Sequence, residues 1–286
     1  MMDLTSPKNI SAIARHFNFT FKKGLGQNFL TSRDVLEKIV LASDCADGVI
    51  EIGPGFGVLT KELSKNSKKV VALEIDERLN DILAYTLDGC DNVKIINCDV
   101  MKADIAEIIK TEFNGERVSV AANLPYYITT PILVRLIEGG FPLKSIVVMI
   151  QKEVAERLAA KPATKEYGAI SVLCSYYCKT ELITSVPSSF FVPPPKVESA
   201  VLRLTFLDKP AVTVKDEKLF FKAVKAAFSQ RRKTLLNCFN SFFSIPKEEL
   251  KEIFASADIE PSRRGETLSL EEFAKLADTL KDSIKS

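Results

Sequence analysis

A short polar and aromatic motif, Asn123-Leu-Pro-Tyr-Tyr127, has the residue types needed to bind and orient an exocyclic amine. Such an amine is conjugated to its ring and is a poor nucleophile. The Asn123 side-chain oxygen and a neighbouring main-chain carbonyl oxygen can accept its two N–H bonds, which turns the nitrogen lone pair toward an electrophile. Pro125 would fix the backbone, and Tyr126 would stack on a base turned out of its helix. The tetrapeptide alone is equally compatible with a rigid loop that buries an aromatic ring.

A second aromatic segment, Phe190-Phe-Val-Pro-Pro-Pro-Lys196, is stiffened by three prolines. Phe191 is a candidate for the second wall of a base pocket. A hydrophobic plug at the edge of a domain explains the same residues equally well.

A glycine-rich segment, Glu51-Ile-Gly53-Pro-Gly55-Phe-Gly57, follows a predicted strand and precedes a predicted helix. Glycines at such a turn let the backbone approach a ligand closely. A dinucleotide-binding fingerprint would need glycine at position 58, which is Val58, and the segment has no phosphate-binding lysine. The spacing therefore favours a ligand without a pyrophosphate over an empty strand–helix turn.

Two acids follow the next predicted strands. Glu74 lies 23 residues after Glu51, where a carboxylate can accept both hydroxyls of a ribose. Asp99 follows the third strand and can accept a hydrogen bond from an adenine amino group. Alone, Glu74 would be read as a surface acid and Asp99 as a helix cap. Together with the glycine turn they predict a site for an adenosine-containing ligand at the ends of parallel strands.

The elements that position these residues are short β-branched strands, each closely followed by a helical pattern. The predicted strands are Val49–Ile52, Val70–Ile75, Val93–Asn97, Val118–Ala122 and Ser145–Ile150. This alternation predicts an α/β fold with a mostly parallel sheet. Val197–Phe206 alternates in polarity and is predicted as a later antiparallel strand at an edge. Capping patterns at Thr31–Asp34, Thr130-Pro131 and Ser269–Glu272 predict helix starts.

The domain organisation changes after Phe206, where Asp208-Lys-Pro210 is predicted as a linker. Apolar residues then recur at helical spacing, so residues 208–286 are predicted to form a small all-helical domain. Its phenylalanines are expected in the core. Residues 23–207 are predicted as the ligand-binding domain, and residues 1–22 as an N-terminal extension.

Composition excludes several classes of function. The six cysteines form no Cys-x-x-Cys pair and His16 is the single histidine, so we expect no metal site and no histidine-based acid–base chemistry. The cysteines are expected to be buried, reduced thiols of a cytoplasmic protein. The sequence has no apolar run long enough to predict a membrane span, and no secretory signal is recognisable.

A basic stretch without an intervening acid contains Lys222, Lys225, Arg231, Arg232 and Lys233, although the net charge of the chain is only +2. Charge alone favours a solvated helix face for this stretch. A surface that contacts phosphates is the functional alternative.

The motifs together resemble the ribosomal RNA adenine dimethyltransferase family. The resemblance spans residues 22 to about 280 and rests on Gly26-Gln-Asn-Phe-Leu30, Glu51–Thr60, Glu74, Asp99, Asn123–Tyr126 and Phe191–Val197. The small-subunit, or kasugamycin-sensitivity, branch is indicated by Gln151–Glu153, Tyr167-Gly168, Arg231–Thr234 and Arg264–Ser269. Ser32 departs from the family, which often has an acid at this position.

The resemblance implies a Rossmann-like class I methyltransferase sheet of seven strands and a helical C-terminal domain. It implies S-adenosylmethionine as the cofactor, and dimethylation of two adjacent adenines in a hairpin loop near the 3′ end of 16S rRNA during late small-subunit assembly. Cofactor contacts are implied at Asn28, Leu30, Gly53, Gly55, Glu74, Asp99 and Asn123. Target-base contacts are implied at Asn123, Leu124, Tyr126 and Phe191.

With this resemblance, Lys222, Lys225 and Arg231–Lys233 are predicted to contact rRNA. The chain is expected to be a monomer. Two alternatives remain open at the level of sequence. One is a large-subunit rRNA methyltransferase of the macrolide-resistance type, and the other is an RNA-binding assembly factor without catalysis. A methyltransferase for a protein amide or a small molecule is disfavoured, because the match spans nearly the whole chain.

Overall fold

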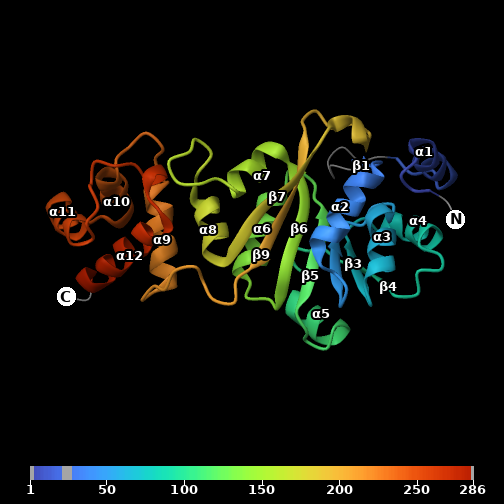
Figure 1. Ribbon diagram of the computed structural model, residues 1–286, viewed down its shortest axis with the longest axis horizontal. Helices are drawn as coiled ribbons and strands as arrows, with labels where there is room; N and C mark the ends of the chain where they lie inside the picture. The colour runs from blue at the N-terminus through green and yellow to red at the C-terminus, as the bar shows by residue number, and fades with distance from the viewer. Residues whose placement is uncertain (1–2, 21–27, 285–286) are drawn as a thin grey trace. The chain divides into compact units, whose positions relative to one another are not determined.

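The computed structural model describes residues 3–20 and 28–284 of the 286-residue chain. The chain divides into two compact units (Figure 1). The first contains Met1–Ala155 and Glu181–Phe206, and the second contains Glu156–Thr180 and Leu207–Ser286. The domain boundary predicted at residue 208 lies at one crossing between the units. The second unit also takes in Glu156–Thr180, which the sequence analysis assigned to the ligand-binding domain.

A seven-stranded sheet forms the centre of the first unit, in the order β4-β3-β2-β5-β6-β9-β7. Its strands are β2 (Val49–Ile52), β3 (Val70–Glu74), β4 (Val93–Asn97), β5 (Val118–Asn123), β6 (Leu143–Gln151), β7 (Cys178–Val186) and β9 (Ser199–Phe206). The neighbours from β4 to β6 are parallel, and β9 is antiparallel to β6. β2 and β3 are buried along their whole length, as expected for strands covered on both faces. The predicted α/β class and mostly parallel sheet are confirmed.

Two details of the sheet differ from the prediction. β9 is antiparallel as predicted, but it does not lie at the edge, because β7 pairs on its outer side. β7 was not predicted as a strand, because only its two end residues are buried and its polar residues do not alternate with apolar ones. A second, two-stranded sheet pairs β1 (Phe29–Leu30) with β8 (Phe191–Val192).

The helices of the first unit are α1 (Pro7–His16), α2 (Arg33–Ser43), α3 (Val58–Asn66), α4 (Asn80–Thr86), α5 (Ile105–Glu112) and α6 (Thr129–Glu138), with 3-10 turns η2 (Glu77–Leu79) and η3 (Ser188–Phe190). The helices after β2, β3, β4 and β5 follow these strands as the sequence predicts, whereas α1 precedes every strand and was not predicted. α7 (Lys152–Leu158) spans the boundary between the units.

Two predicted helix starts were wrong in detail. The α2 cap is Ser32, whose Oγ accepts the Val35 N–H at 3.5 Å. Thr31 is unavailable as the cap because its hydroxyl donates to the Phe190 carbonyl oxygen at 2.9 Å. α6 begins at Thr129, so Pro131 is its third residue rather than its first.

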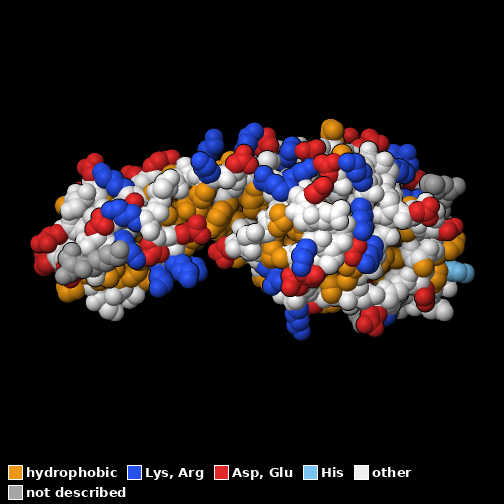
Figure 2. Space-filling model, turned by 90° about the horizontal axis from the view of Figure 1, so that it is seen from below, with side chains coloured by type: hydrophobic (Ala, Val, Ile, Leu, Met, Phe, Trp, Pro, Cys, Tyr) orange, Lys and Arg blue, Asp and Glu red, His pale blue; other side chains and the backbone are white. Residues whose placement is uncertain are grey.

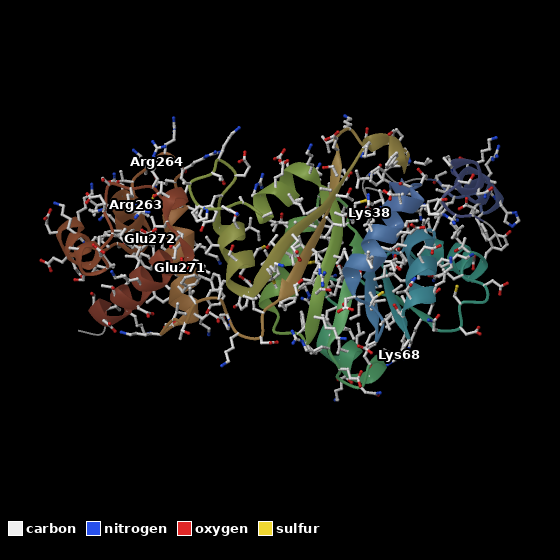
Figure 3. The ribbon with its side chains drawn as sticks, viewed as in Figure 1. Lys38, Lys68, Arg263, Arg264, Glu271 and Glu272 are labelled. Carbon is white, nitrogen blue, oxygen red and sulfur yellow. The ribbon has the colours of Figure 1, made fainter. Side chains whose placement is uncertain are left out.

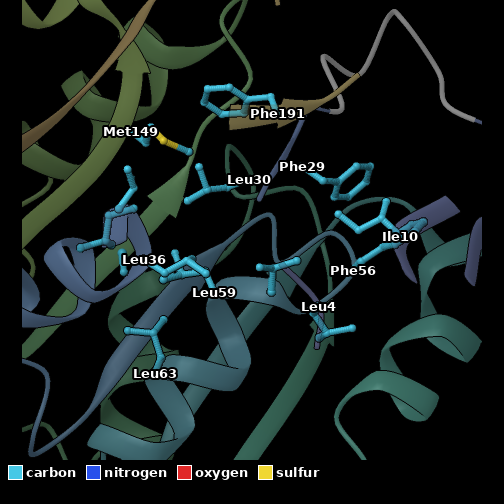
Figure 4. Close-up of a cluster of buried hydrophobic side chains, with 14 of the residues drawn as sticks. Leu4, Ile10, Phe29, Leu30, Leu36, Phe56, Leu59, Leu63, Met149 and Phe191 are labelled. Carbon is cyan, nitrogen blue, oxygen red and sulfur yellow. The ribbon is translucent and has the colours of Figure 1, made fainter. Parts of the chain in front are cut away.

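The core of the first unit contains apolar residues from α1, α2, α3 and β1 together with Phe191 and Met149 (Figure 4). Leu36, Leu59 and Leu63 lie on the sides of α2 and α3 that are closed to solvent. The core therefore joins the segment before the first sheet strand to the loop that carries Phe191.

The second unit is helical and contains α8 (Ala169–Tyr177), α9 (Glu217–Ala227), α10 (Leu235–Phe243), α11 (Lys247–Ser256), η4 (Gly265–Thr267) and α12 (Leu270–Ile284). Phe220, Phe239, Phe254 and Phe273 are fully buried in its core, which confirms their predicted packing role. For Phe242 the prediction is wrong, because this side chain is 44% exposed. The capping box of α12 is also confirmed, because Ser269 and Glu272 exchange side-chain to backbone hydrogen bonds at 3.2 and 2.8 Å. Figure 2 shows positive and negative side chains intermixed on the face that it presents.

Candidate active site

A cavity lies at the carboxyl ends of β2, β3 and β5 in the first unit. Its volume, including the space at its open mouth, is about 830 Å³. Polar groups reach it from each of these strands and from the segment before β1. Its lining includes Asn28, Glu51, Gly53, Gly55, Glu74, Asn123 and Tyr127. This is the edge of a parallel sheet at which open α/β folds bind ligands. No lysine or arginine lines the cavity among the described residues.

The glycine loop forms one wall of the cavity. Gly53 and Gly55 have φ angles of +70° and +58°, in the left-handed region that favours glycine. A Cβ atom at Gly55 would lie 2.7 Å from the Phe29 ring, whereas one at Gly53 would meet no protein atom within 4 Å. Gly55 is therefore required for packing. Gly53 leaves open space where a ligand can approach the backbone.

Glu74 ends β3 and lines the cavity with only 4% of its surface exposed. Its two oxygens accept hydrogen bonds from the Asp76 N–H at 2.8 Å and the Gly55 N–H at 3.3 Å. Burial raises the pKa of Glu74, and these backbone N–H groups oppose that effect. Each carboxylate oxygen can accept a further hydrogen bond. The carboxyl group is thus held in place with acceptor capacity left for a ligand hydroxyl.

Asn123 ends β5, and its side-chain Nδ2 donates to the Asn28 carbonyl oxygen at 2.8 Å. This bond settles which end of the amide faces which way, because only the nitrogen can donate. The Oδ1 atom of Asn123 is left as an acceptor in a residue that lines the cavity. The acceptor role of Asn123 stays a prediction, and this amide orientation leaves Oδ1 available for it.

Leu124 and Tyr126 do not line the cavity, whereas their neighbours Asn123, Pro125 and Tyr127 do. The Leu124 side chain is buried and its N–H donates to the Met149 carbonyl oxygen at 3.1 Å, so its backbone alone can face a ligand. The phenol of Tyr126 lies 2.7 Å from the buried Ser199 hydroxyl on β9. Burial raises the pKa of Tyr126, and the Ser199 hydrogen bond opposes it.

Tyr127 lines the cavity and is 60% exposed, and the sequence analysis did not select it. Its signal was the doubled tyrosine at the end of the Asn123 motif. Sequence spacing could not show which of the two rings turns inward.

Phe191 and Asp99 are also outside the cavity lining. Phe191 is buried in β8, paired with Leu30 of β1, and Figure 4 shows it in the apolar cluster with Leu30 and Met149. Asp99 is half-buried, and its Oδ1 accepts the Met101 N–H at 2.9 Å in a local turn. The structure thus brings together Asn28, Leu30, Gly53, Gly55, Glu74 and Asn123 around one cavity, and leaves Asp99, Leu124, Tyr126 and Phe191 beside it.

Glu51 is a cavity residue that the sequence analysis treated only as the acid before the glycine turn. Its side chain is 2% exposed, and its Oε2 atom has no hydrogen-bond partner among the described residues. Burial raises the pKa of Glu51 to about 8, the Thr60 hydroxyl opposes the rise, and the Glu74 charge adds to it. An acid inside an otherwise apolar buried strand was the available signal.

The predicted basic residues lie on the second unit and are all exposed. Lys222 and Lys225 belong to α9, and Arg231, Arg232 and Lys233 form the turn between α9 and α10. Arg231 donates to the Lys165 carbonyl oxygen at 3.2 Å, which ties the turn to the loop before α8. Figure 3 labels Arg263 and Arg264 on the same unit, where Arg263 is paired with Glu272. A further basic pair of the sequence, Lys22 and Lys23, lies outside the described residues.

Residues 3–20 and 28–284 contain no cluster of three His, Cys, Asp or Glu side chains arranged to hold a metal ion. Within the same ranges, no helix is both long and apolar enough to cross a membrane.

The fold and the cavity define a Rossmann-like enzyme of the class I methyltransferase type. A family model described as "Ribosomal RNA adenine dimethylase" matches residues 18–282, and the chain therefore belongs to the ribosomal RNA adenine dimethylase family. It is 50% identical to the ribosomal RNA small subunit methyltransferase A of Shouchella clausii strain KSM-K16, over 99% of this chain and 97% of that protein. It is also 50% identical to the protein of the same name from Bacillus cytotoxicus, with 98% of both chains covered.

Two solved structures share the fold of this chain. A dimethyladenosine transferase from Plasmodium falciparum has a TM-score of 0.77 at 26% identity and covers 89% of this chain and 98% of its own. The 23S rRNA methyltransferase ErmE has a TM-score of 0.69 at 24% identity, over 89% of this chain and 100% of that one. The second likeness shows a shared fold.

Proposed function

We propose that this chain uses S-adenosylmethionine to dimethylate the N6 amino groups of two adjacent adenines in the 3′-terminal hairpin loop of 16S rRNA. The structural observation that best supports this proposal is the Asn123–Asn28 hydrogen bond, which leaves the Asn123 Oδ1 atom as an acceptor beside the cavity. Membership of the adenine dimethylase family supports the reaction, and the two bacterial relatives named for the small subunit support the substrate.

The cavity fits the proposed cofactor in charge and in shape. Its described lining contains the carboxyl groups of Glu51 and Glu74 and no lysine or arginine, which suits a cationic nucleoside rather than a nucleotide phosphate. Glu74 would accept the ribose hydroxyls, and Gly53 would admit the ligand to the backbone. Asn28, Leu30, Gly55, Asp99 and Asn123 complete the proposed cofactor contacts. The bound cofactor supplies a methyl group on a positively charged sulfur.

The protein's part in the reaction is to position the amine. Asn123 Oδ1 would accept one N–H bond of the adenine amino group, and the Leu124 backbone would provide the second acceptor. Fixing both N–H groups on these acceptors takes the nitrogen lone pair out of conjugation with the ring and turns it toward the methyl group. The nitrogen then forms its bond to the methyl carbon as the carbon–sulfur bond breaks, and the methylated amine loses a proton to solvent. Tyr126 and Phe191 would hold the extruded base between them, which requires both rings to become accessible when RNA binds.

The exposed basic residues of the second unit are proposed to contact rRNA phosphates. Lys222, Lys225 and Arg231–Lys233 are solvent-exposed, and no ion pair occupies them among the described residues. Unpaired cations are available to displace counterions from a nucleic acid backbone. We further propose that the protein acts in the cytoplasm as a monomer, on a late assembly intermediate of the small subunit.

Methyl transfer from labelled S-adenosylmethionine to small subunits that lack this modification tests the proposal. Wild type should form dimethyladenine near the 3′ end of 16S rRNA, and Asn123→Ala should form almost none. Asn66→Ala, which alters an exposed amide at the end of α3, is the matched control and should behave as wild type. Transfer to large-subunit precursors instead would favour the macrolide-resistance type. Subunit binding without any transfer by wild type would favour the assembly-factor alternative.

A further inference from the structure

Residues 3–20 pack on the first unit without reaching its cavity. Their apolar side chains Leu4, Ile10 and Phe19 are buried in the core of that unit, and Figure 4 shows Leu4 and Ile10 in the same cluster as Phe56. Among the described residues that line the cavity, none belongs to this segment. Any effect of the segment on a bound ligand must therefore pass through other residues.

Phe19 connects the segment to the glycine loop. Its ring meets the Phe56 ring edge to face, with the ring centroids 5.3 Å apart. Phe56 is fully buried between Gly55 and Gly57, and its ring centroid lies 4.4 Å from that of Phe29. Gly55 lines the cavity, and a close-packed interior transmits displacements. A displacement of Phe19 would therefore disturb the cavity wall that the glycine loop forms.

Arg78 connects the same segment to the acid at the end of β3. Its Nε and Nη2 atoms donate to the two Asp76 carboxylate oxygens at 2.7 and 2.5 Å. Asp76 is 7% exposed, and its N–H donates to Glu74 Oε1 at 2.8 Å. On its other side, Arg78 donates from Nη1 to the Thr20 carbonyl oxygen at 3.3 Å, and its guanidinium lies 4.8 Å from the centre of the Phe19 ring. One guanidinium thus holds the segment against the turn that orients Glu74.

We infer that Arg78 is a positioning residue for the cofactor, which couples the docking of residues 3–20 to the occupancy of the cavity. The inference rests on the proposed function, because the ligand is the proposed nucleoside cofactor, whose ribose hydroxyls would bind Glu74. The docked segment holds the glycine loop and the Glu74 turn in the geometry that the ligand needs, so docking raises the affinity. By thermodynamic reciprocity, the ligand stabilises the docked segment by the same factor.

Hydrogen exchange of the wild-type protein with and without S-adenosylhomocysteine tests this coupling. The ligand should slow the exchange of the backbone amides of α1 and of Phe19 by at least about fivefold, although none of these residues lines the cavity. α5 is the internal control, because it belongs to the same unit and contributes no residue to the cavity lining. Its amides should be slowed by a clearly smaller factor.

Arg78→Gln removes the two-point pair with Asp76 and the positive charge over the Phe19 ring. Calorimetry should show that the affinity for S-adenosylhomocysteine falls by at least about fivefold, and the ligand should no longer protect α1. Arg78→Lys keeps the charge but lacks the planar fork that bonds both oxygens, so it should recover part of the affinity. Arg15→Gln, which changes an exposed arginine of α1, is the matched control and should bind as wild type does.

The possible failures separate the inference from the proposed function. Tight binding by wild type with equal slowing in α1 and α5 would overturn the inference alone, because the ligand would then stabilise the whole unit. Wild-type affinity in Arg78→Gln, together with a lower urea midpoint, would also overturn it, since Arg78 would then serve only the stability of the fold. No binding of S-adenosylhomocysteine by wild type would overturn the proposed cofactor and the inference with it. The wild-type measurements decide the first and last cases even if Arg78→Gln does not fold.

Discussion

The side-chain amide of Asn123 and the backbone carbonyl of Asn28 are joined by a 2.8 Å hydrogen bond across 95 residues of sequence. The bond connects the end of β5 to the segment that precedes β1. It also fixes the orientation of the Asn123 amide. Asn123 and Asn28, which both line the cavity, are thus held together by a polar contact.

Asn123→Asp should abolish most of the methyl transfer. It replaces the donor Nδ2 with an oxygen that faces the Asn28 carbonyl oxygen, so a hydrogen bond becomes a repulsion. We expect the transfer rate to fall by at least about a hundredfold. Single-turnover transfer to unmodified small subunits measures the effect, with Asn66→Asp as the control. A loss of less than tenfold would show that the amide orientation is unimportant.

Tyr126→Phe should distinguish the contribution of the Tyr126 ring from that of its hydroxyl group. The substitution leaves the buried Ser199 hydroxyl without its partner, which costs about 1–3 kcal/mol of stability. Methyl transfer should persist, because the ring remains available for stacking, whereas Tyr126→Ala should lose it. Urea unfolding and the transfer rate are measured on the same preparations. Equal loss of transfer in both variants would mean that methyl transfer depends on the Tyr126 hydroxyl group and not on the ring.

Gly55→Ala should damage both folding and cofactor binding. Its φ of +58° strains any L side chain, and the new Cβ atom would lie 2.7 Å from the Phe29 ring. Gly89→Ala isolates the backbone strain, because Gly89 has a φ of +77° and open space around it. We expect Gly55→Ala to lose about 1–3 kcal/mol more stability than Gly89→Ala. Identical unfolding midpoints would mean that the Phe29 ring moves aside freely.

Replacing Arg231, Arg232 and Lys233 with alanine should weaken binding to the small subunit and reduce its dependence on salt. Each lost phosphate contact lowers the slope of log affinity against log salt by roughly 0.7–0.9. The charge-matched control replaces Lys247, Lys251 and Lys275, exposed residues of α11 and α12. Filter binding across a salt series measures both. The same slope in the two triple variants would remove the basic turn from the proposed surface.

Glu51 should make the free protein less stable as pH rises. The folded state keeps the Glu51 proton up to a pKa of about 8, while the unfolded chain releases it near the ordinary value, so unfolding releases a proton between these limits. The free energy of unfolding therefore falls with rising pH in this window, by up to about 1.4 kcal/mol per unit. Glu51→Gln should match wild type at pH 4.5 and exceed it at pH 8 in urea unfolding. Parallel pH profiles of the two proteins would contradict the raised pKa.

The sequence predicted the residues that strands and tight turns position. Gly53, Glu74 and Asn123 each stand at the end of a buried strand, and parallel strand ends meet at one edge of the sheet. Their meeting around one cavity follows from strand order alone.

Residues on loops were harder to place. Tyr126 turns toward Ser199 on β9, 73 residues later, and this partner leaves Tyr127 to face the cavity. Phe191 pairs with Leu30 in a two-residue strand too short to give any periodic signal. Side-chain direction in such loops depends on tertiary partners, which local spacing does not encode.

The pairing of β1 with β8 has a consequence for how the protein is made. Thr31 and Phe190 are bonded across 159 residues, and Leu30 of the cavity wall is held by Phe191. During synthesis the amino-terminal part emerges first and has no partner for this edge until the chain has grown past Val192. The cavity is thus finished by one of the last segments of its own unit to emerge, so a nascent or prematurely ended chain carries the glycine loop and the acids without the wall that encloses them.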